Sequence, residues 1–108
     1  MTTDPTPAKA RGDWREGLPE GVARDALPGA RAIRFDSRDV QPGDVFVCIV
    51  GGQADGHAYA PQAVERGAVA LVAQDGHGDG IEALGVPVVR VPDARATLAA
   101  VSAAHEGF

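Results

Sequence analysis

DSRDVQPGDVFVCIVGGQADGH, residues 36–57, holds a charged segment, a proline-glycine turn, an apolar run and a glycine-rich turn, in that order. Pro42 and Gly43 predict a tight reversal, because proline presets one backbone angle and glycine tolerates the next. Residues 45–50 are apolar throughout, as in a strand that is covered on both faces of its sheet. The stretch therefore predicts a buried strand with a turn at each end.

The flanking sequence alternates between two periods. Residues 33–35 alternate apolar with polar side chains, which is typical of a half-buried strand. Residues 58–67 have a helical period that places Tyr59 on the apolar face, with Pro61 in the first turn and Gly67 as the stop.

Further along the chain, three more segments are predicted, together with a final helix that begins after Asp93. These are strands at 68–73 and 87–91 and a short helix or turn at 81–85. Strands that alternate with helices predict an α/β fold, a small mixed sheet of about four or five strands with some parallel pairing and with helices packed on it.

The N-terminal part of the chain has a different composition. Residues 1–30 are rich in Pro, Gly, Ala and scattered charges and lack a sustained apolar period, so we expect a mobile or loosely docked leader. Within it, the spacing of four apolar residues would allow a short helix that docks on the body: Trp14, Leu18, Val22 and Leu27. Residues 31–108 are predicted to form one domain, since 108 residues leave little room for a second core.

Composition excludes several classes of protein. The chain has 10 Lys and Arg against 15 Asp and Glu, a net charge of -5, and hence no broad basic surface for nucleic acid. It has neither an apolar run of roughly 20 residues nor a secretory signal, so we expect a cytoplasmic protein without a membrane span. The single cysteine, Cys48, lies in an apolar run and is expected to be buried.

The sequence shows few of the motifs that carry chemistry. Its one lysine, Lys9, lies in the expected leader, so the phosphate-loop motif G-x-x-x-x-G-K-[ST] is absent. The glycines at 76, 78 and 80 do not fit G-x-G-x-x-G, and the histidines at 57, 77 and 105 lack an H-x-x-x-H spacing. A Mg²⁺ site would need the turns to bring together Asp36, Asp39, Asp44 and Asp55. Turns favour aspartate for local hydrogen bonding alone, so we expect neither a metal site nor catalytic residues here.

The order of these elements resembles the N-terminal domain of the Mur ligases, from about residue 33 to 108. The matching motifs are Asp36-Ser37-Arg38, PGDVFV at 42–47, Gly51, Asp55-Gly56-His57, Ala63, GAVA at 67–70, VPV at 86–88, and Val91 with Asp93. The triplet Gly52-Gln53-Ala54 before Asp55 makes the chain look most similar to the MurE type. The MurF type shares the DSR, PGD-[LV]-FV and DGH elements and is the alternative within the family.

This resemblance implies a role in peptidoglycan synthesis. Mur ligases extend the peptide on UDP-N-acetylmuramic acid; their first domain holds the UDP end, the second carries the ATP phosphate loop, and the third brings in the amino acid. We accordingly expect an excised first domain that binds UDP-N-acetylmuramoyl-L-alanyl-D-glutamate for an enzyme that uses ATP and Mg²⁺ to add the third peptide residue. A free-standing relative is the other option. Without the central and C-terminal domains, the chain should not catalyse.

By the same resemblance, the contacts with the UDP part come from Phe35, Ser37, Gly52, Gln53 and Ala54. A serine hydroxyl can donate to phosphate, a glutamine amide can pair with a uracil edge, and glycine lets a backbone N–H approach closely. His57 is a possible further contact. Asp36, Arg38 and Asp55 are interpreted as residues that hold the two turns in shape.

Two other classes of function stay open from the sequence. One is a stand-alone binding or interaction module with this fold. The other is a small metal-dependent enzyme that uses Asp36, Asp55 and His57.

Overall fold

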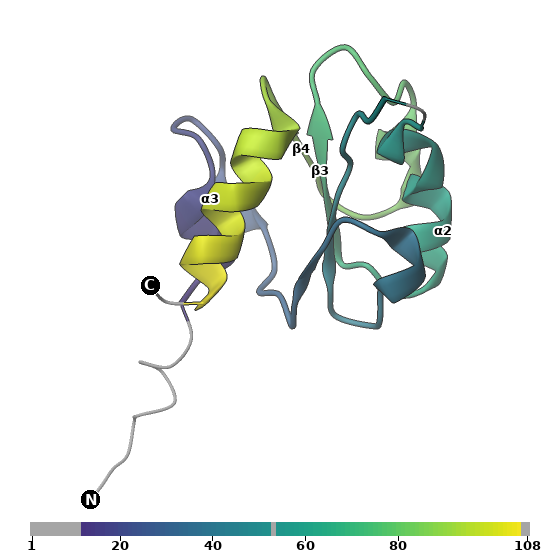
Figure 1. The fold of residues 1–108 in the computed structure, drawn as a ribbon. Coiled ribbons are helices and arrows are strands. Elements are labelled where there is room, and N and C mark those ends of the chain that lie inside the picture. Colours follow the sequence, from purple (N-terminus) through teal and green to yellow (C-terminus); the bar gives the residue numbers. More distant parts are fainter. Residues whose placement is uncertain (1–11, 53, 107–108) are drawn as a thin grey trace, which may run out of the picture.

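A four-stranded parallel sheet lies between two helical layers in the computed structural model, which describes residues 12–52 and 54–106 (Figure 1). The strands follow the chain order across the sheet: β1 (Ile33–Arg34), β2 (Val45–Val47), β3 (Ala70–Gln74) and β4 (Val88–Val91). In the register, Val45 lies beside both Ile33 and Ala70, and Val72 lies beside Val89. The predicted α/β class is confirmed. The four strands pair in parallel rather than in a mixed arrangement, because each connection returns the chain to the same end of the sheet before the next strand begins.

Short helical segments cover one face of the sheet and a longer helix covers the other. The first layer contains η3 (Ser37–Asp39), η4 (Gly56–Tyr59), α2 (Ala60–Glu65) and η5 (Ile81–Leu84). The second contains α3 (Ala94–Glu106), η1 (Trp14–Gly17) and the segment around η2 (Arg24–Ala26). Figure 1 shows α2 and α3 on opposite sides of β3. As expected, Asp93 caps α3, since its Oδ1 accepts from the N–H of Ala96 at 3.0 Å.

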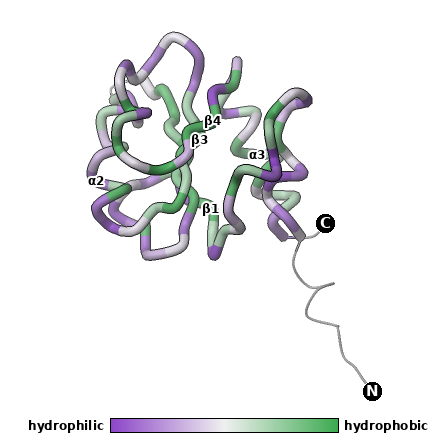
Figure 2. Tube along the Cα trace, turned by 180° about the vertical axis from the view of Figure 1, so that it is seen from behind, coloured by the Kyte–Doolittle hydropathy of each residue, from purple (hydrophilic) through white to green (hydrophobic). Residues whose placement is uncertain are grey.

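The alternation of side chains along β2 creates two cores. Val45 and Val47 face α3 and η1, whereas Phe46 and Cys48 face α2. The side chains of β3 alternate between the same two cores. In Figure 2, the trace of the strands is mainly hydrophobic and the trace around them is more hydrophilic. The predicted burial of Cys48 is confirmed, since none of its surface is exposed.

The N-terminal segment is part of the core from residue 12 onwards. Trp14 is 1% exposed and its Nε1–H donates to the carbonyl of Pro28 at 2.9 Å, while Gly12 donates to the carbonyl of His105. The expected single helix is instead two 3-10 turns, and Pro19 lies between them, where it interrupts helical hydrogen bonding. The four apolar residues do dock on the body, since Trp14, Leu18 and Leu27 are buried in the core and Val22 packs against it. Residues 1–11 lie outside the described part of the chain.

The boundaries of the predicted elements shift by a few residues. The helix expected at 58–67 is η4 followed by α2, with Pro61 in the first turn of α2 as predicted. Gly67 follows with a φ of +109°, and an added Cβ there would lie 2.5 Å from Cα of Pro42. Among the described residues, no helix has both the length and the apolar character needed to cross a bilayer.

Candidate functional site

A cavity of about 480 Å³ opens where β1 and β2 end. Its walls come from β2, from the segments that follow β1 and β2, and from the start of the helical layer: Phe35, Asp36, Ser37, Arg38, Phe46, Ile49, Ala54, Gly56 and Tyr59. The carboxyl ends of parallel strands are the usual place for ligands in α/β sheets. The structure therefore brings three of the residues expected from the resemblance, Phe35, Ser37 and Ala54, to one cleft.

The first wall is built by η3. Asp36 begins this turn, and its Oδ1 accepts from the backbone N–H of Arg38 at 2.9 Å. The Arg38 side chain bonds both carboxylate oxygens, which lowers the pKa of Asp36 to about 2. Phe35 precedes this turn and is 63% exposed, although it is apolar. The predicted structural role of Asp36 and Arg38 is consistent with these bonds, and Arg38 also lines the cleft.

Ser37 links η3 to α2 within the helical layer. Its side chain is buried, and its Oγ donates to Oε1 of Gln62, on α2, at 2.8 Å. The hydroxyl proton expected to reach a phosphate is therefore engaged within the protein. The oxygen of the hydroxyl retains the capacity to accept a hydrogen bond.

The second wall is the glycine-rich turn after β2. The N–H of Gly51 donates to the carbonyl of Ala54, and the N–H of Gly56 donates to the carbonyl of Ile49, both at 2.8 Å. These bonds and an antiparallel bridge between Val50 and Asp55 close the turn and place Ala54 at the cleft. Gly52 is exposed on the same turn but does not line the cavity, and Gln53 lies outside the described residues.

Four wall residues were missed by sequence reasoning: Phe46, Ile49, Gly56 and Tyr59. Tyr59 was expected on the buried face of a helix, yet it is 47% exposed and faces the cleft. Ile49 was interpreted as part of the β2 strand, which in fact ends at Val47. The 3-10 geometry of η4 changes the direction of Tyr59, and no local sequence signal reports that change.

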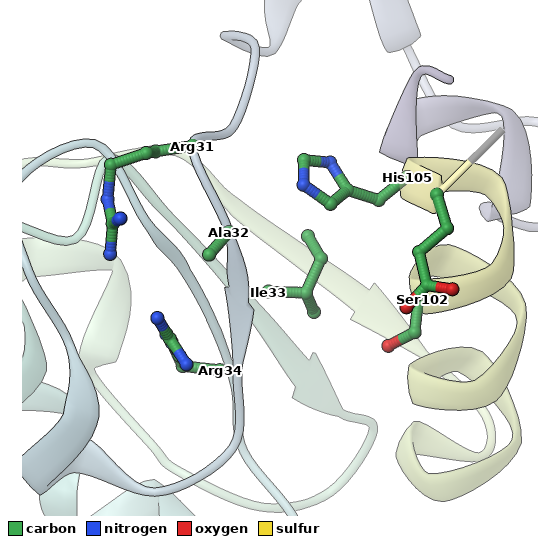
Figure 3. Close-up of a pocket in the computed structure, with 7 residues that line it drawn as sticks. Arg31, Ala32, Ile33, Arg34, Ser102 and His105 are labelled. Carbon is green, nitrogen blue, oxygen red and sulfur yellow. The ribbon is translucent and has the colours of Figure 1, made fainter. Parts of the chain in front are cut away.

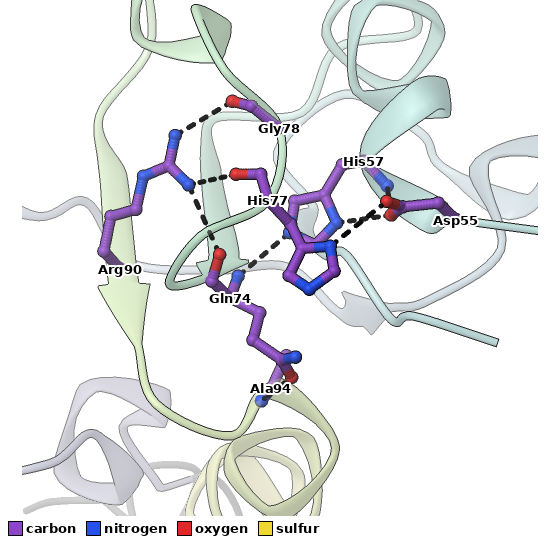
Figure 4. Close-up of polar contacts among 7 residues, drawn as sticks. All are labelled: Asp55, His57, Gln74, His77, Gly78, Arg90 and Ala94. Atoms are coloured by element: carbon purple, nitrogen blue, oxygen red, sulfur yellow. Dashed lines mark hydrogen bonds and ion pairs between the residues drawn. The ribbon is translucent and has the colours of Figure 1, made fainter.

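Asp55, His57 and His77 form a cluster next to this cleft (Figure 4). Nδ1 of His57 lies 2.5 Å from Oδ1 of Asp55, and Nδ1 of His77 lies 3.4 Å from Oδ2. The two rings stack with their centroids 5.4 Å apart. Burial tends to raise the pKa of Asp55, but the hydrogen bonds from His57 and His77 outweigh it and lower this pKa. Sequence spacing gave no sign that His57 and His77 would meet.

In the described part of the chain, this cluster is the group whose ligand atoms lie near enough to hold a metal ion, within 4.8 Å of one another. However, Nε2 of His57 accepts from the backbone N–H of Gln74 at 2.9 Å, so the neutral ring keeps its proton on Nδ1. A metal ion at Nδ1 would have to displace that proton. His57 is also buried, does not line the cleft and has both ring nitrogens bonded within the protein, which leaves little scope for the ligand contact considered from sequence.

The four aspartates considered as a Mg²⁺ site do not assemble. Asp36 pairs with Arg38, while Asp44 is fully buried beside Arg31 and Arg34. The metal-dependent centre of Asp36, Asp55 and His57 does not form as a unit either, since Asp36 is not part of the cluster around Asp55.

A larger hollow of about 560 Å³ lies between β1 and the end of α3. Figure 3 shows Ser102 and His105 extending from α3 toward β1, while Arg31 and Arg34 extend away from that helix. Both arginines pair with the buried Asp44. This hollow contains none of the residues expected to bind a ligand.

Comparisons with known proteins identify the family. Residues 30–106 match the family described as "Mur ligase family, catalytic domain". The chain is 49% identical over 80 residues to the UDP-N-acetylmuramyl-tripeptide synthetase of Roseiflexus sp. (strain RS-1). These 80 residues are 74% of this chain and 15% of that protein. It is 45% identical over 86 residues to the UDP-N-acetylmuramoyl-L-alanyl-D-glutamate–2,6-diaminopimelate ligase of Geobacillus thermodenitrificans (strain NG80-2), covering 80% of this chain and 17% of that enzyme.

A ligase with the same name from Chelativorans sp. (strain BNC1) is 49% identical over 93 residues, which is 85% of this chain and 18% of the enzyme. The chain thus spans less than a fifth of the length of these relatives. The matched segment contains the sheet, both walls of the cleft and all of α3. This chain therefore belongs to the Mur ligase family and is similar to its MurE-type members.

Proposed function

We propose that this chain is the first domain of a MurE-type ligase and that its cleft binds the uridine diphosphate part of UDP-N-acetylmuramoyl-L-alanyl-D-glutamate. One observation carries the proposal: Phe35, Ser37 and Ala54 line a single cavity although they come from two separate loops. The names of the relatives support the substrate class.

The chemistry of the cleft suits a nucleotide. Phe35 and Tyr59 are the large apolar side chains that remain exposed among the described residues, and both line it. Stacking of a base on an aromatic ring contributes about 1–3 kcal/mol, which favours uracil at this place. Arg38 lies at the rim, where it is paired with Asp36, and its guanidinium would exchange this carboxylate for a phosphate of the diphosphate.

Catalysis would require groups from the longer enzyme. Formation of an amide through an acyl phosphate needs Mg²⁺ and a clamp on the ATP phosphates. These 108 residues contain no phosphate-loop motif, so we expect the central and C-terminal domains to hold ATP and Mg²⁺. The isolated chain would then bind substrate without catalysing, and the full enzyme would act in the cytoplasm.

Titration of the isotope-labelled chain with UDP, and then with UDP-N-acetylmuramoyl-L-alanyl-D-glutamate, tests this proposal. Amide shifts should concentrate at residues 35, 37 and 52–54. Affinity should be weak, because the other domains normally share the cost of ordering the substrate. Phe35→Ala should weaken binding, whereas Ser102→Ala, in the hollow beside α3, should leave it unchanged.

Three results would contradict the proposal. They are no response at millimolar nucleotide, a response that appears only with Mg²⁺, and shifts centred on the hollow beside α3. A Phe35→Ala variant that binds as well as the unmodified chain would argue against stacking of the base at this wall.

A further inference from the structure

The cluster of Asp55, His57 and His77 joins two loops that are distant in the sequence. Asp55 closes the turn that follows β2, and His77 lies in the loop that follows β3. The Asp55 carboxylate interacts with the backbone N–H and the ring of His57 through Oδ1, and with the ring of His77 through Oδ2. The two oxygens of one half-buried carboxylate thus contact both loops.

His57 is the fixed member of the cluster. Its ring is buried, accepts from Gln74 through Nε2 and donates to Asp55 through Nδ1. Both ring nitrogens of His57 are thus engaged within the protein, whereas the His77 side chain is half-buried.

The loop that carries His77 is held from its other side by Arg90, on β4 (Figure 4). The Arg90 guanidinium donates to the carbonyls of Gln74, His77 and Gly78 and pairs with Glu82. Gly78 has a φ of +65°, and an added Cβ there would lie 2.8 Å from Cδ2 of His57. The loop therefore rests directly on the His57 ring, which orients His77 toward Asp55.

We propose that His77 is a positioning residue for the cleft: through Asp55 and its stacking on His57, it holds Ala54 and the glycines of the turn after β2 in place. Ala54, the residue before Asp55, lines the cavity, and its carbonyl accepts from Gly51. The consequence for nucleotide binding rests on the proposed function, whereas the consequence for the turn itself does not.

Amide hydrogen exchange of the ligand-free chain tests the proposal. The amides of Gly51 and Gly56 report on the turn, and the amide of Cys48, which donates to Val72 across the sheet, reports on global stability. His77→Ala should lower protection at Gly51 and Gly56 about two- to tenfold, as for loss of one hydrogen bond, and leave Cys48 unchanged. His77→Asn should restore most of this protection, because the amide nitrogen of asparagine can replace Nδ1 as a donor.

Rescue by His77→Asn separates positioning from simple packing. UDP affinity, measured in parallel, should weaken in His77→Ala and recover in His77→Asn.

Unchanged protection of the turn in His77→Ala would overturn the proposal, as would an equal loss at Cys48, which would make His77 a general stabiliser. If the turn responds as expected but the unmodified chain binds no UDP, the positioning role stands and the proposed function is wrong.

Discussion

A Cβ atom added to Gly17 would lie 2.4 Å from the carbonyl oxygen of Ala100, so η1 and α3 meet backbone against backbone. This contact lets Trp14 enter the core beside Val101. The segment before β1 is consequently a structural part of the domain from residue 12 onwards.

Substitution of Gly17 by alanine should therefore destabilise the fold. We expect the free energy of unfolding, measured by urea titration, to fall by about 1–3 kcal/mol, because the two backbones must separate. Gly29→Ala is the matched control, since an added Cβ there meets nothing within 4 Å. Equal free energies of unfolding for the two variants would show that η1 can move away from α3 without loss of stability.

The loop after β3 provides a second matched pair. Gly76 and Gly78 both have positive φ, so alanine strains the backbone at either position. At Gly78, alanine additionally meets the His57 ring, whereas at Gly76 it meets nothing within 4 Å. Hydrogen exchange at Gly51 should therefore increase in Gly78→Ala and stay near its normal rate in Gly76→Ala. The same increase in both variants would point to strain alone.

The acid stability of the domain should depend on Asp44. Burial tends to raise the pKa of Asp44, but hydrogen bonds from Gln41, Arg31 and Arg34 outweigh it, so the pKa is lowered. A carboxylate with a lowered pKa stabilises the fold above its unfolded pKa, about 3.9, and this contribution is lost as the pH falls through the folded pKa.

Asp44→Asn should therefore lower the free energy of unfolding at neutral pH by about 1–3 kcal/mol, because the charge-assisted hydrogen bonds from Arg31 and Arg34 are weakened. Its stability should also fall less steeply in acid, as urea titrations between about pH 7 and 3 would show. The exposed Asp25→Asn is the control and should match the unmodified chain. Parallel pH profiles for Asp44→Asn and the unmodified chain would contradict this account.

The single thiol should be inert in the folded protein. Cys48 has no exposed surface, and burial raises the pKa of its thiol to about 12. A chromogenic disulfide reagent at mild alkaline pH should react with one thiol in urea and scarcely at all without it. Rapid reaction under native conditions would mean that β2 opens locally.

Much of the fold could be predicted because its determinants are local. The apolar run at β2, the turn at Pro42 and the stop at Gly67 each act within a few residues of the chain. The α/β class and the elements around the sheet were therefore predicted correctly. The exact ends of β2 and α2 were not, since they depend on where neighbouring segments supply hydrogen bonds.

Sequence alone determined that strands and helices alternate, and its motifs indicated the family and the two turns that form the cleft. Tertiary structure decided which side chains share a surface. It buried Trp14 against α3, exposed Tyr59 at the cleft and brought His77 to Asp55. Periodicity reports how one segment packs on average, whereas these pairings arise when separate segments fold against one sheet, and no local pattern encodes them.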